Sequence, residues 1–307
     1  MPRLSRFALM ERNKDVIAKS FYDQGQSGFF SLPEIANFIE KNKPEWSVPN
    51  KTSVIEILKF LTGEEILKEI TIKLPRRSTA RYAWGSPSVY EIALSLNKNS
   101  YLTHYSALFL HGLTNNVTKT VYTNVEQGNK SYYYDDDDDD EDEMEQKNID
   151  LAFSRPMRKT NQIAHFELDN TKYQVYMLNG KYHGRLGVKE LKIDKLQLPI
   201  TDIERTLIDI VVRPNYCGGV EEVLDAFIAA KGKFSVNKLV SNLKKMKYKY
   251  PYHQLIGFYL EKSDYKPDIL NLLKQFEIKY NFYLTYQMKE KSYSDTWKVY
   301  YPKGFAE

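Results

Sequence analysis

The sequence predicts an α+β protein with two domains. Its 307 residues are too many for one ordinary small core, and a hydrophobic content of 42% is ample for packed interiors. Residues 1–88 show helical periodicity followed by a pair of strand-like runs. Residues 89–307 mix short strands with several amphipathic helices. We therefore expect a domain boundary close to residue 88.

Three helices are expected at the start of the chain. Apolar residues recur at helical spacing in residues 5–24, which end in a glycine-rich turn. The next helix begins with Ser31, and Glu34 three residues later completes the pattern of a capping box. A third helix is expected over residues 51–62, because apolar side chains again recur there every three or four positions.

A basic hairpin is expected after the third helix. The stretch ILKEITIKLPRRSTARYAWG, residues 66–85, has two strand-like runs around a polar turn. It holds Arg76, Arg77 and Arg81, and Glu69 is its sole carboxylate. Three helices followed by a hairpin is the order of a winged helix-turn-helix domain, in which the third helix enters the major groove of DNA. The hairpin would then lie along the phosphates, whose negative charges would pair with the arginines.

This arrangement predicts a DNA-contacting set on the third helix and the hairpin. Residues 1–90 carry 14 basic and 10 acidic side chains, a modest positive excess. A protein-docking module with solvated arginines is the alternative, because such domains also bind proteins. The predicted DNA-contacting residues are Lys51, Thr52, Ser53, Lys59, Arg76, Arg77 and Arg81.

The second domain, residues 89–307, is expected to combine strands and helices. Its closing segment, 282–305, is rich in tyrosine and is expected to be extended. The predicted strands are 119–125, 148–156, 163–168, 173–178 and 191–198, and the predicted helices are the two halves of 87–113, then 201–214, 218–234, 236–246, 252–263 and 266–277.

An acidic run interrupts an otherwise basic chain. Residues 135–145, DDDDDDEDEME, hold ten carboxylates, and without them the net charge of +4 would be +14. A basic surface favours a nucleic-acid partner. Like-charge blocks are usually solvated, so we predict a disordered acidic loop at 126–148. Mimicry of DNA is the alternative role; a calcium loop is disfavoured, because it needs spaced ligands and glycine turns.

Three stretches of the chain resemble a known family. They are YLTHYSALFLHGLT at 101–114, ITDIERTLIDIVVRPNYCGGVEEVL at 200–224 and DTWKVYYPKGF at 295–305. Together they resemble the AbiEi family, the antitoxins of bacterial type IV toxin–antitoxin systems that act in phage abortive infection. The acidic run departs from the family's pattern.

The resemblance implies two activities. The winged helix would act as a transcriptional autorepressor by binding inverted repeats in the promoter as double-stranded DNA. Residues 89–307 would act as the antitoxin against a partner toxin that resembles nucleotidyltransferases. A stand-alone winged-helix regulator, whose second domain senses a signal or binds another protein, is the alternative function.

The second of these stretches contains four polar residues with two possible roles. Arg205 and Asp209 are four positions apart on a predicted helix and can therefore form an ion pair. The group could belong to a toxin-facing surface, or it could fix the helix against a sheet, which is the role we favour. The four residues are Glu204, Arg205, Thr206 and Asp209.

Catalytic and metal sites are not expected. His104 and His111 are seven positions apart, a poor spacing for a helical metal pair, so each is expected to be a buried histidine bonded to a carbonyl. Asp169 with Glu190 and Lys192 imitates the acid–acid–Lys site of a metal-dependent nuclease, which we keep as a minor alternative. We expect no catalytic residue, no metal and no cofactor.

The remaining patterns concern the surface and the compartment. Lysines alternate with tyrosines over residues 244–250, which suits either a nucleic-acid or acidic partner or the negative end of a helix. A single cysteine, Cys217, excludes an internal disulfide and fits a reducing cytoplasm. With no signal peptide and no run of about 20 apolar residues, we expect a cytoplasmic protein without a membrane partner.

Overall fold

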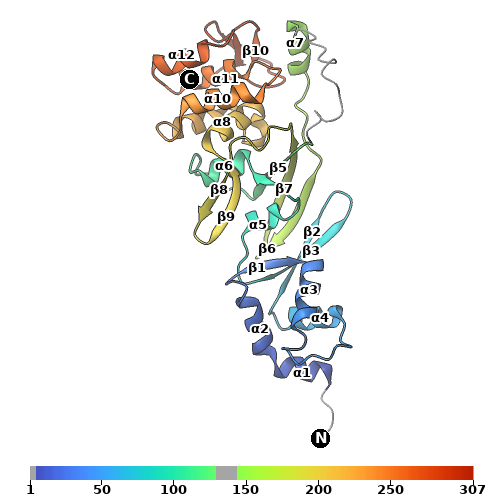
Figure 1. Ribbon diagram of the computed structural model, residues 1–307. Coiled ribbons are helices and arrows are strands. Elements are labelled where there is room, and N and C mark those ends of the chain that lie inside the picture. Colours follow the sequence, from blue (N-terminus) through green and yellow to red (C-terminus); the bar gives the residue numbers. More distant parts are fainter. Residues whose placement is uncertain (1–4, 129–143, 307) are drawn as a thin grey trace, which may run out of the picture. The chain divides into compact units, whose positions relative to one another are not determined.

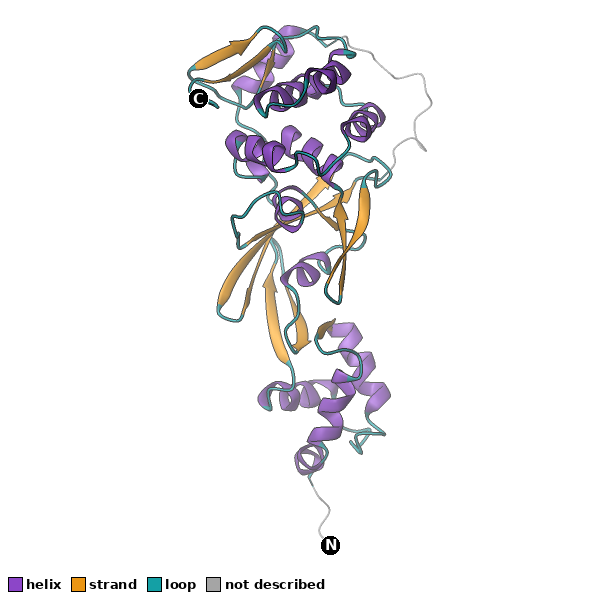
Figure 2. Cartoon of the chain, turned by 90° about the vertical axis from the view of Figure 1, so that its left-hand side faces the viewer, coloured by secondary structure: helices purple, strands orange, loops and turns teal. Residues whose placement is uncertain are grey.

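The computed structural model describes residues 5–128 and 144–306 (Figure 1). The chain divides into two compact units. The first contains residues 1–96 and 162–175, and the second contains residues 97–161 and 176–307. Helices and strands occur in both units, which confirms the predicted α+β class (Figure 2). The first unit therefore extends past residue 88 and also takes in a segment that the sequence assigns to the second domain.

The first unit begins with helices and continues into a sheet. The helix expected over 5–24 is two helices separated at Asn13, and a short strand that the sequence analysis missed precedes the next helix. The elements are α1 (Arg6–Arg12), α2 (Lys14–Tyr22), β1 (Gly28–Ser31), α3 (Leu32–Asn42), α4 (Val54–Gly63), β2 (Lys68–Lys73), β3 (Ser78–Trp84), α5 (Val89–Leu94), β6 (Ile163–Leu168) and the first part of β7 (Thr171–Gly180).

Hydrogen bonds join the strands of this unit in the order β1-β3-β2-β6-β7. Strands β2 and β3 form the predicted antiparallel hairpin, with Ile70 opposite Arg81 and Lys73 opposite Ser78. Alternate residues of β2 are buried, Ile70 and Ile72 among them, so one face of the strand packs on the core and the other meets solvent. On β3, Tyr82 and Trp84 belong to the core that the helices form, and the turn of the hairpin is left exposed.

Local sequence signals explain where α3 and α4 begin. Each helix starts after a serine whose backbone N–H donates to the glutamate three residues later, at 2.7 Å from Ser31 to Glu34 and 2.8 Å from Ser53 to Glu56. These reciprocal caps satisfy backbone groups that have no partner within the helix. The predicted capping box at Ser31 is confirmed. In both helices, most of the apolar residues face a core that includes the buried Trp46.

The second unit combines one sheet, one smaller sheet and a set of packed helices. The larger sheet has the order β7-β5-β4-β9-β8, and the smaller has the order β10-β12-β11. The elements are β4 (Tyr101–Leu102), α6 (His104–Leu110), β5 (Thr120–Glu126), α7 (Gln146–Ser154), β8 (Val188–Ile193), β9 (Leu196–Thr201), α8 (Ile203–Val212), the 3-10 helix Pro214–Tyr216, α9 (Val220–Ala229), α10 (Val236–Met246), α11 (Tyr252–Lys262), α12 (Pro267–Lys274), β10 (Phe282–Tyr283), β11 (Lys291–Ser294) and β12 (Val299–Pro302).

Several predicted elements of this unit need correction. Residues 148–156 are not a strand: most of them lie in helix α7, whose Ile149 and Phe153 are one turn apart and both buried. The predicted strand 191–198 is a hairpin instead, because Asp194, at φ 51°, reverses the chain between β8 and β9. The stretch 101–113 is a short strand followed by a helix. Alternation and helical spacing coincide in such short apolar runs, so tertiary pairing decides between them.

Close packing of helices and the smaller sheet forms the core of the second unit. Helices α8 and α10–α12 lie together (Figure 1). Trp297 is completely buried against Gly257 of α11, where the Cβ atom of any other residue would lie only 2.2 Å from the indole ring. Glycine is therefore needed at this position for space. The predicted extended tail is confirmed as strands β10–β12, which close this core.

The acidic run falls largely outside the described residues. The prediction of a disordered loop at 126–148 concerns residues 129–143, which the structure does not describe, and the described residues 146–148 are helical. Among the helices of residues 5–128 and 144–306, none combines the length and the apolar character that crossing a membrane requires.

Candidate functional site

Helix α4 and the hairpin turn expose most of the side chains expected to contact DNA. Lys51, Ser53 and Lys59 are exposed, as are Arg76 and Arg77 in the turn between β2 and β3. The backbone N–H of Leu74 donates to the carbonyl of Arg77 at 2.8 Å, which closes this turn. Within the described residues, neither arginine of the turn has an ion-pair partner. Both guanidinium groups are therefore available to an external anion.

The sequence analysis missed an apolar member of this surface. Ile55, in the first turn of α4, is 67% exposed and lies one turn before Lys59. A large aliphatic side chain gains nothing from such exposure. The signal was present in the sequence, since Ile55 is out of phase with the buried positions Ile57, Leu58 and Leu61.

The prediction that Thr52 contacts DNA is wrong for the folded chain. Thr52 lies before α4 rather than on it, and only 1% of its surface is exposed. Its backbone N–H donates to the carbonyl of Pro49 at 2.9 Å, in a turn that leads into the helix. Lys51 also precedes the helix, but its side chain remains exposed.

Arg81 also has to be removed from the predicted DNA-contacting set. It is only 8% exposed. Its Nε donates to the Ser95 hydroxyl and one Nη to the Ser95 carbonyl, both at 2.9 Å, and the other Nη donates to the carbonyl of Ala80. Burial lowers the pKa of Arg81, and the nearby Glu34 opposes that shift. Arg81 therefore ties β3 to the end of α5, and the three arginines do not form one cluster.

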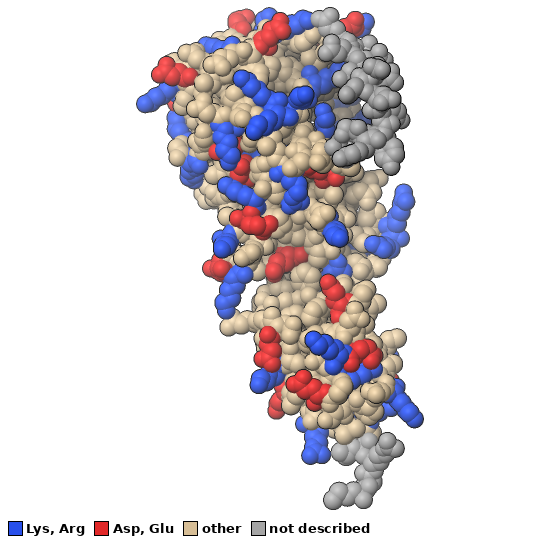
Figure 3. Space-filling model, in the orientation of Figure 1, with Lys and Arg blue, Asp and Glu red and all other residues tan. Residues whose placement is uncertain are grey.

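Charges of both signs share the surface of the first unit (Figure 3). On α4, Glu56 accepts from Arg6 of α1 at 3.2 Å and also caps its own helix. Hydrogen bonds from Ser53 to the carboxylate lower the pKa of Glu56. The carboxylate on this helix is thus already paired, whereas Lys59 and the two arginines of the turn have no ion-pair partner in the described part of the chain.

In the second unit, the two stretches 101–114 and 200–224 meet in a buried polar network. Arg205 of α8 donates from Nε to Asp209 at 2.7 Å, and the Thr103 hydroxyl donates to the other oxygen of Asp209 at 2.9 Å. Arg205 also donates to the carbonyl of Leu186 at 2.8 Å. Burial disfavours the charge on Arg205, but Asp209 outweighs it, so the pKa of Arg205 is raised.

The rest of the ERT-L-D motif is also buried. Glu204 is 7% exposed and accepts from the backbone N–H of Ser235 at 3.0 Å and from Lys238 at 3.1 Å. Burial favours the neutral form of Glu204, but these hydrogen bonds prevail and lower its pKa. The Thr206 hydroxyl lies 2.8 Å from that of Thr201. These four side chains are buried, and their hydrogen bonds join α8 to its neighbours, which agrees with the structural role favoured by the sequence.

The two histidines of this region, His104 and His111, differ in the hydrogen bonds that their ring nitrogens make. His111 Nε2 lies 2.7 Å from the carbonyl of Thr201, as expected for a structural histidine. His104 is 7% exposed and has a left-handed backbone at φ 49°. Its Nδ1 lies 3.1 Å from the Thr103 hydroxyl, but its Nε2 is buried with no protein partner among the described residues. The expected carbonyl bond is therefore present at His111, whereas His104 makes none with the residues that the structure describes.

A cavity of about 170 Å³ adjoins this network in the second unit. The ends of β5 and β7, helices α6 and α8 and the segment after α10 contribute to its walls. Three of its lining residues are cationic and one is acidic, and that one is already paired with Arg205. Its lining includes Thr103, His104, Lys181, Arg205, Asp209 and Arg213.

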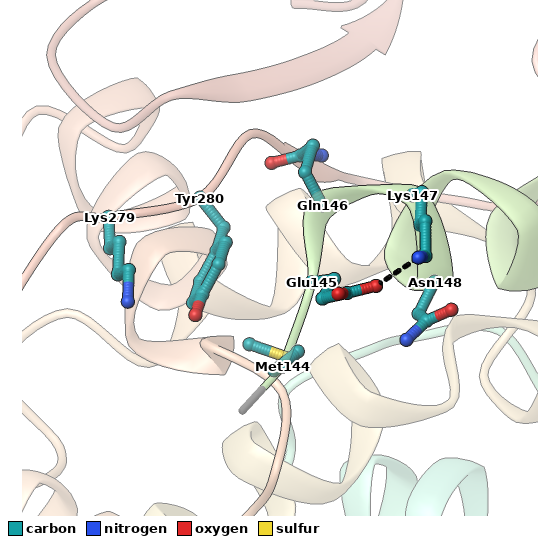
Figure 4. A pocket seen from close by; sticks show the side chains of 7 residues that line it. All are labelled: Met144, Glu145, Gln146, Lys147, Asn148, Lys279 and Tyr280. Atoms are coloured by element: carbon teal, nitrogen blue, oxygen red, sulfur yellow. Dashed lines mark ion pairs between the residues drawn. The ribbon is translucent and has the colours of Figure 1, made fainter. Parts of the chain in front are cut away.

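A larger hollow lies at the start of α7 (Figure 4). Glu145 and Lys147 form an ion pair at 2.6 Å within it, and Lys279 and Tyr280 line the opposite wall. Its polar side chains are exposed or half-buried, and two of its charged groups already satisfy each other. The hollow therefore has fewer features of a specific binding site than the smaller cavity has.

The three residues of the alternative nuclease site, Asp169, Glu190 and Lys192, do not lie together in one unit. Asp169 forms an ion pair with Lys68 in the first unit, and Glu190 and Lys192 are exposed on β8 of the second. Across the described residues, no three His, Cys, Asp or Glu side chains are grouped so that they could hold a metal ion. The structure thus offers this reading no assembled metal site among the residues that it describes.

The lysines near residue 245 end a helix. Lys244 and Lys245 occupy the last turn of α10, where cations interact favourably with the helix dipole. Tyr248 is part of the cavity wall. A structural role therefore explains the positions of Lys244, Lys245 and Tyr248. The lysines are exposed, so they can also contact a partner.

Comparisons with known proteins bear on the fold. No protein-family model matches the chain, and no curated protein matches its sequence. One solved structure that it resembles is that of the Rv2827c protein from Mycobacterium tuberculosis, with a TM-score of 0.60 and 13% sequence identity. The similarity covers 97% of this chain and 92% of that one. At this identity the likeness shows a shared fold, and the resemblance to AbiEi antitoxins stays a prediction.

Proposed function

We propose that the chain is a bacterial DNA-binding repressor of its own operon, and that its second unit is the antitoxin against a nucleotidyltransferase-like toxin of an abortive-infection system. The first unit would act as a winged helix-turn-helix domain. In support, its elements from α2 to β3 run helix, strand, helix, helix, strand, strand, and β1 adds a third strand to the hairpin. The proposed roles require no catalytic residue, metal or cofactor.

The observation that carries the DNA-binding proposal is the pairing of a free helix face with a free basic turn. Lys51 and Ser53 are exposed just before α4 and Lys59 is exposed on it, and Arg76 and Arg77 of the hairpin turn have no ion-pair partner among the described residues. In a winged helix, these two elements reach the major groove and the adjacent phosphates. Phosphate contacts would position the domain, and side chains of α4 would read base edges.

The salt dependence of binding tests this assignment. The full chain is titrated onto double-stranded DNA from its own promoter at several salt concentrations, and fluorescence anisotropy is measured. Replacing Arg76 and Arg77 together with alanine should weaken binding and reduce the slope of log affinity against log salt by about 0.9 for each phosphate that is no longer neutralised. Replacing the exposed Lys189 and Lys192 of the second unit is the matched control. An unchanged slope in the arginine variant would refute the assignment.

The antitoxin proposal rests on the resemblance to the AbiEi family. The burial of the ERT-L-D motif limits which residues could contact a toxin. Because Glu204, Arg205, Thr206 and Asp209 are buried, direct contact with a toxin would use other, exposed residues of the second unit. Its surface carries many lysines, some of them near residue 245, which would suit an acidic partner face (Figure 3).

Co-expression separates the two roles. The full-length Arg76→Ala/Arg77→Ala variant should lose repression of its promoter and still restore growth when the neighbouring toxin gene is induced independently. The full chain is preferable to a truncation, because residues 162–175 of the first unit lie within the sequence of the second. Loss of growth rescue in this soluble variant would contradict a separate antitoxin unit.

A stand-alone regulator with a sensing unit is the second candidate. The cavity beside Arg205 favours it, since sensing requires a place for a ligand. A promoter whose repression changes with a small molecule, in cells that lack any toxin gene, would support this candidate over the antitoxin.

A further inference from the structure

The outer face of the smaller sheet carries a row of tyrosines that neither proposed role uses. Tyr283 of β10 pairs with Tyr300 of β12, which pairs in turn with Tyr293 of β11, so the three lie in register across the strands. Side chains alternate along a strand, and the neighbouring Phe282 and Val299 are completely buried in the core. The tyrosines therefore lie on the opposite face, where each is at least partly exposed.

The ring of Tyr293 lies across this face instead of projecting from it. Its hydroxyl donates at 2.6 Å to the side chain of Asn281, which precedes β10 at the far edge of the sheet. The ring therefore extends over the middle strand β12. Its centre lies 4.8 Å from that of Tyr300, and the centres of Tyr300 and Tyr283 are 5.2 Å apart. The three rings thus form one continuous aromatic surface, of which Tyr293 is the most exposed member, at 38%.

A lysine lies over the other two rings. The Nζ atom of Lys291, the first residue of β11, is 5.1 Å from the centre of the Tyr283 ring and 5.6 Å from that of Tyr300. Because one ammonium group lies over both rings, their faces are directed towards the open side of the sheet. A cation over exposed rings is held weakly, and Lys291 has no ion-pair partner in the part of the chain that the structure describes. It can therefore leave the rings for an external anion.

Helix α7 holds one end of the row in place. Phe153 stacks with Tyr283 at 5.6 Å, with an angle of 17° between the ring planes, and the Tyr283 hydroxyl donates to Asp150 at 2.9 Å. A ring that is fixed before a ligand arrives loses little conformational freedom when the ligand binds.

The charge around the row favours a polyanion over a neutral ligand. Residues 281–303 carry four lysines and two carboxylates, and one of these carboxylates, Glu290, pairs with Lys303 at 3.5 Å. Positive charge therefore remains beside the rings. Aromatic side chains on adjacent strands, with cations next to them, suit a nucleic acid strand, because bases stack on the rings while the cations meet the phosphates.

We propose that this face of the smaller sheet binds a single-stranded nucleic acid. One base stacks on Tyr293 and a neighbouring base on the rings of Tyr300 and Tyr283, and Lys291 moves from these rings to a phosphate. No covalent bond is made or broken. A duplex does not bind in this way, because its bases already stack on one another and present only their edges. RNA and single-stranded DNA share the bases and phosphates that the face would recognise.

Fluorescence anisotropy with labelled oligouridine, oligodeoxythymidine and a duplex of the same length tests the proposal. The full chain carries Arg76→Ala/Arg77→Ala throughout, so the duplex contacts proposed for the first unit do not contribute. Saturable binding of a single strand is expected, tighter than that of the duplex. The single strand that binds more tightly identifies RNA or DNA as the ligand, and either result supports the proposal.

Substitutions of Tyr293 separate stacking from other contacts. Tyr293→Leu keeps an apolar side chain but removes the ring, and it should weaken single-strand binding about tenfold. Tyr293→Phe keeps the ring and loses only the hydrogen bond to Asn281, so it should bind nearly as the parent chain does. Tyr182→Leu, at an exposed tyrosine outside the smaller sheet, is the matched control. Thermal unfolding of each variant shows that the fold is retained.

The salt dependence of single-strand binding tests the role of Lys291. Lys291→Gln should reduce the slope of log affinity against log salt by about 0.7, the value for one phosphate contact on a single strand. Lys189→Gln, at an exposed lysine of β8, should leave the slope unchanged. Absence of single-strand binding, equal affinity of Tyr293→Leu and Tyr293→Phe, or an unchanged slope in Lys291→Gln would each overturn the proposal. These measurements involve neither the promoter nor a toxin, so their outcome is independent of the proposed function.

Discussion

The β2–β3 hairpin of the first unit and helix α8 of the second both carry arginines, and they use them differently. Arg76 and Arg77 are exposed in a turn and have no ion-pair partner among the described residues, whereas Arg205 is 4% exposed and bonded to Asp209. A solvated arginine can exchange water for an external phosphate at small cost to the fold. A buried arginine is bound to its partner, and removing either leaves an unpaired charge.

Arg81 shows that the difference arises from position. It lies four residues after Arg77 in the same hairpin, yet β3 directs it to the carbonyls of Ser95 and Ala80. Arginine content alone therefore does not identify a binding surface. The contrast predicts that substitutions in the hairpin turn alter binding and leave stability intact, and that substitutions in the buried network do the reverse.

Breaking the buried pair should have the largest effect on stability. Arg205→Leu would leave Asp209 buried without its cation, and we expect a loss of about 3–5 kcal/mol in the free energy of unfolding, measured by urea denaturation. Arg205→Leu/Asp209→Leu should lose less than the sum of the two single changes. As a control, Lys303→Ala at the exposed pair with Glu290 should change stability by less than about 0.5 kcal/mol.

The pH dependence of stability should reveal His104. Burial lowers its pKa to about 4 from an unfolded value near 6.5. Asp209 opposes this shift, and the charges of Arg213 and Arg205 reinforce it. Between these pH values the unfolded chain binds a proton that the folded chain does not, so the contribution is complete above pH 6.5 and is lost as pH falls towards 4.

The expected loss is about 3 kcal/mol. It is measured as the difference between urea unfolding at pH 7 and at pH 4, in buffers without phosphate. The His104→Asn variant should show a pH dependence smaller by this amount, and His165→Asn, at an exposed histidine of β6, should match the natural chain. Equal pH dependence in both variants would show that His104 is not held neutral.

Two glycines provide a comparison of backbone constraint. Gly187 has φ 74°, and a Cβ there would lie 2.6 Å from the Cβ of Arg205, so Gly187→Ala should cost about 2 kcal/mol. Gly63, the last residue of α4, has no atom within 4 Å of the corresponding position. Gly63→Ala should be neutral or slightly stabilising in thermal unfolding. A neutral Gly187→Ala would mean that the loop before β8 can shift away from α8.

Within the hairpin, Arg81 and Arg77 should separate stability from binding. Arg81→Met removes hydrogen bonds to Ser95 and Ala80, with an expected loss of about 1–2 kcal/mol in stability. Arg77→Met should stay within about 0.5 kcal/mol of the natural chain and instead weaken DNA binding. Stability is followed by urea unfolding and binding by anisotropy. The reverse pattern would mean that the exposed turn is not the contact surface.

The smallest effect is expected from the exposed Ile55. If α4 reads the major groove, this side chain can contact the methyl group of a thymine. Promoter DNA made with uracil lacks that methyl group, and it should bind the natural chain about fourfold more weakly, the value of one buried methyl-sized group. Ile55→Ala should bind both DNAs alike. Equal binding of both DNAs by the natural chain would remove Ile55 from the reading surface while leaving the DNA-binding proposal intact.

The sequence alone determined much of this protein through short-range signals. The capping box at Ser31, the alternation of β2 and the apolar spacing of α8–α12 follow from local hydrogen bonding and from periodicity, and both can be read along the chain. The exposed Arg76 and Arg77 and the pairing of Arg205 with Asp209 were likewise predictable, because a polar turn and an i, i+4 spacing are local features.

Tertiary structure alone decided the rest. It made residues 146–154 a helix, placed 162–175 in the first unit and buried Thr52 and Arg81. It also brought Thr103 to Asp209, about a hundred positions away in the chain. Burial and long-range hydrogen bonds depend on which surfaces pack together. Arginines thus became exposed and solvated in the hairpin turn of one unit and part of a buried network beside a cavity in the other.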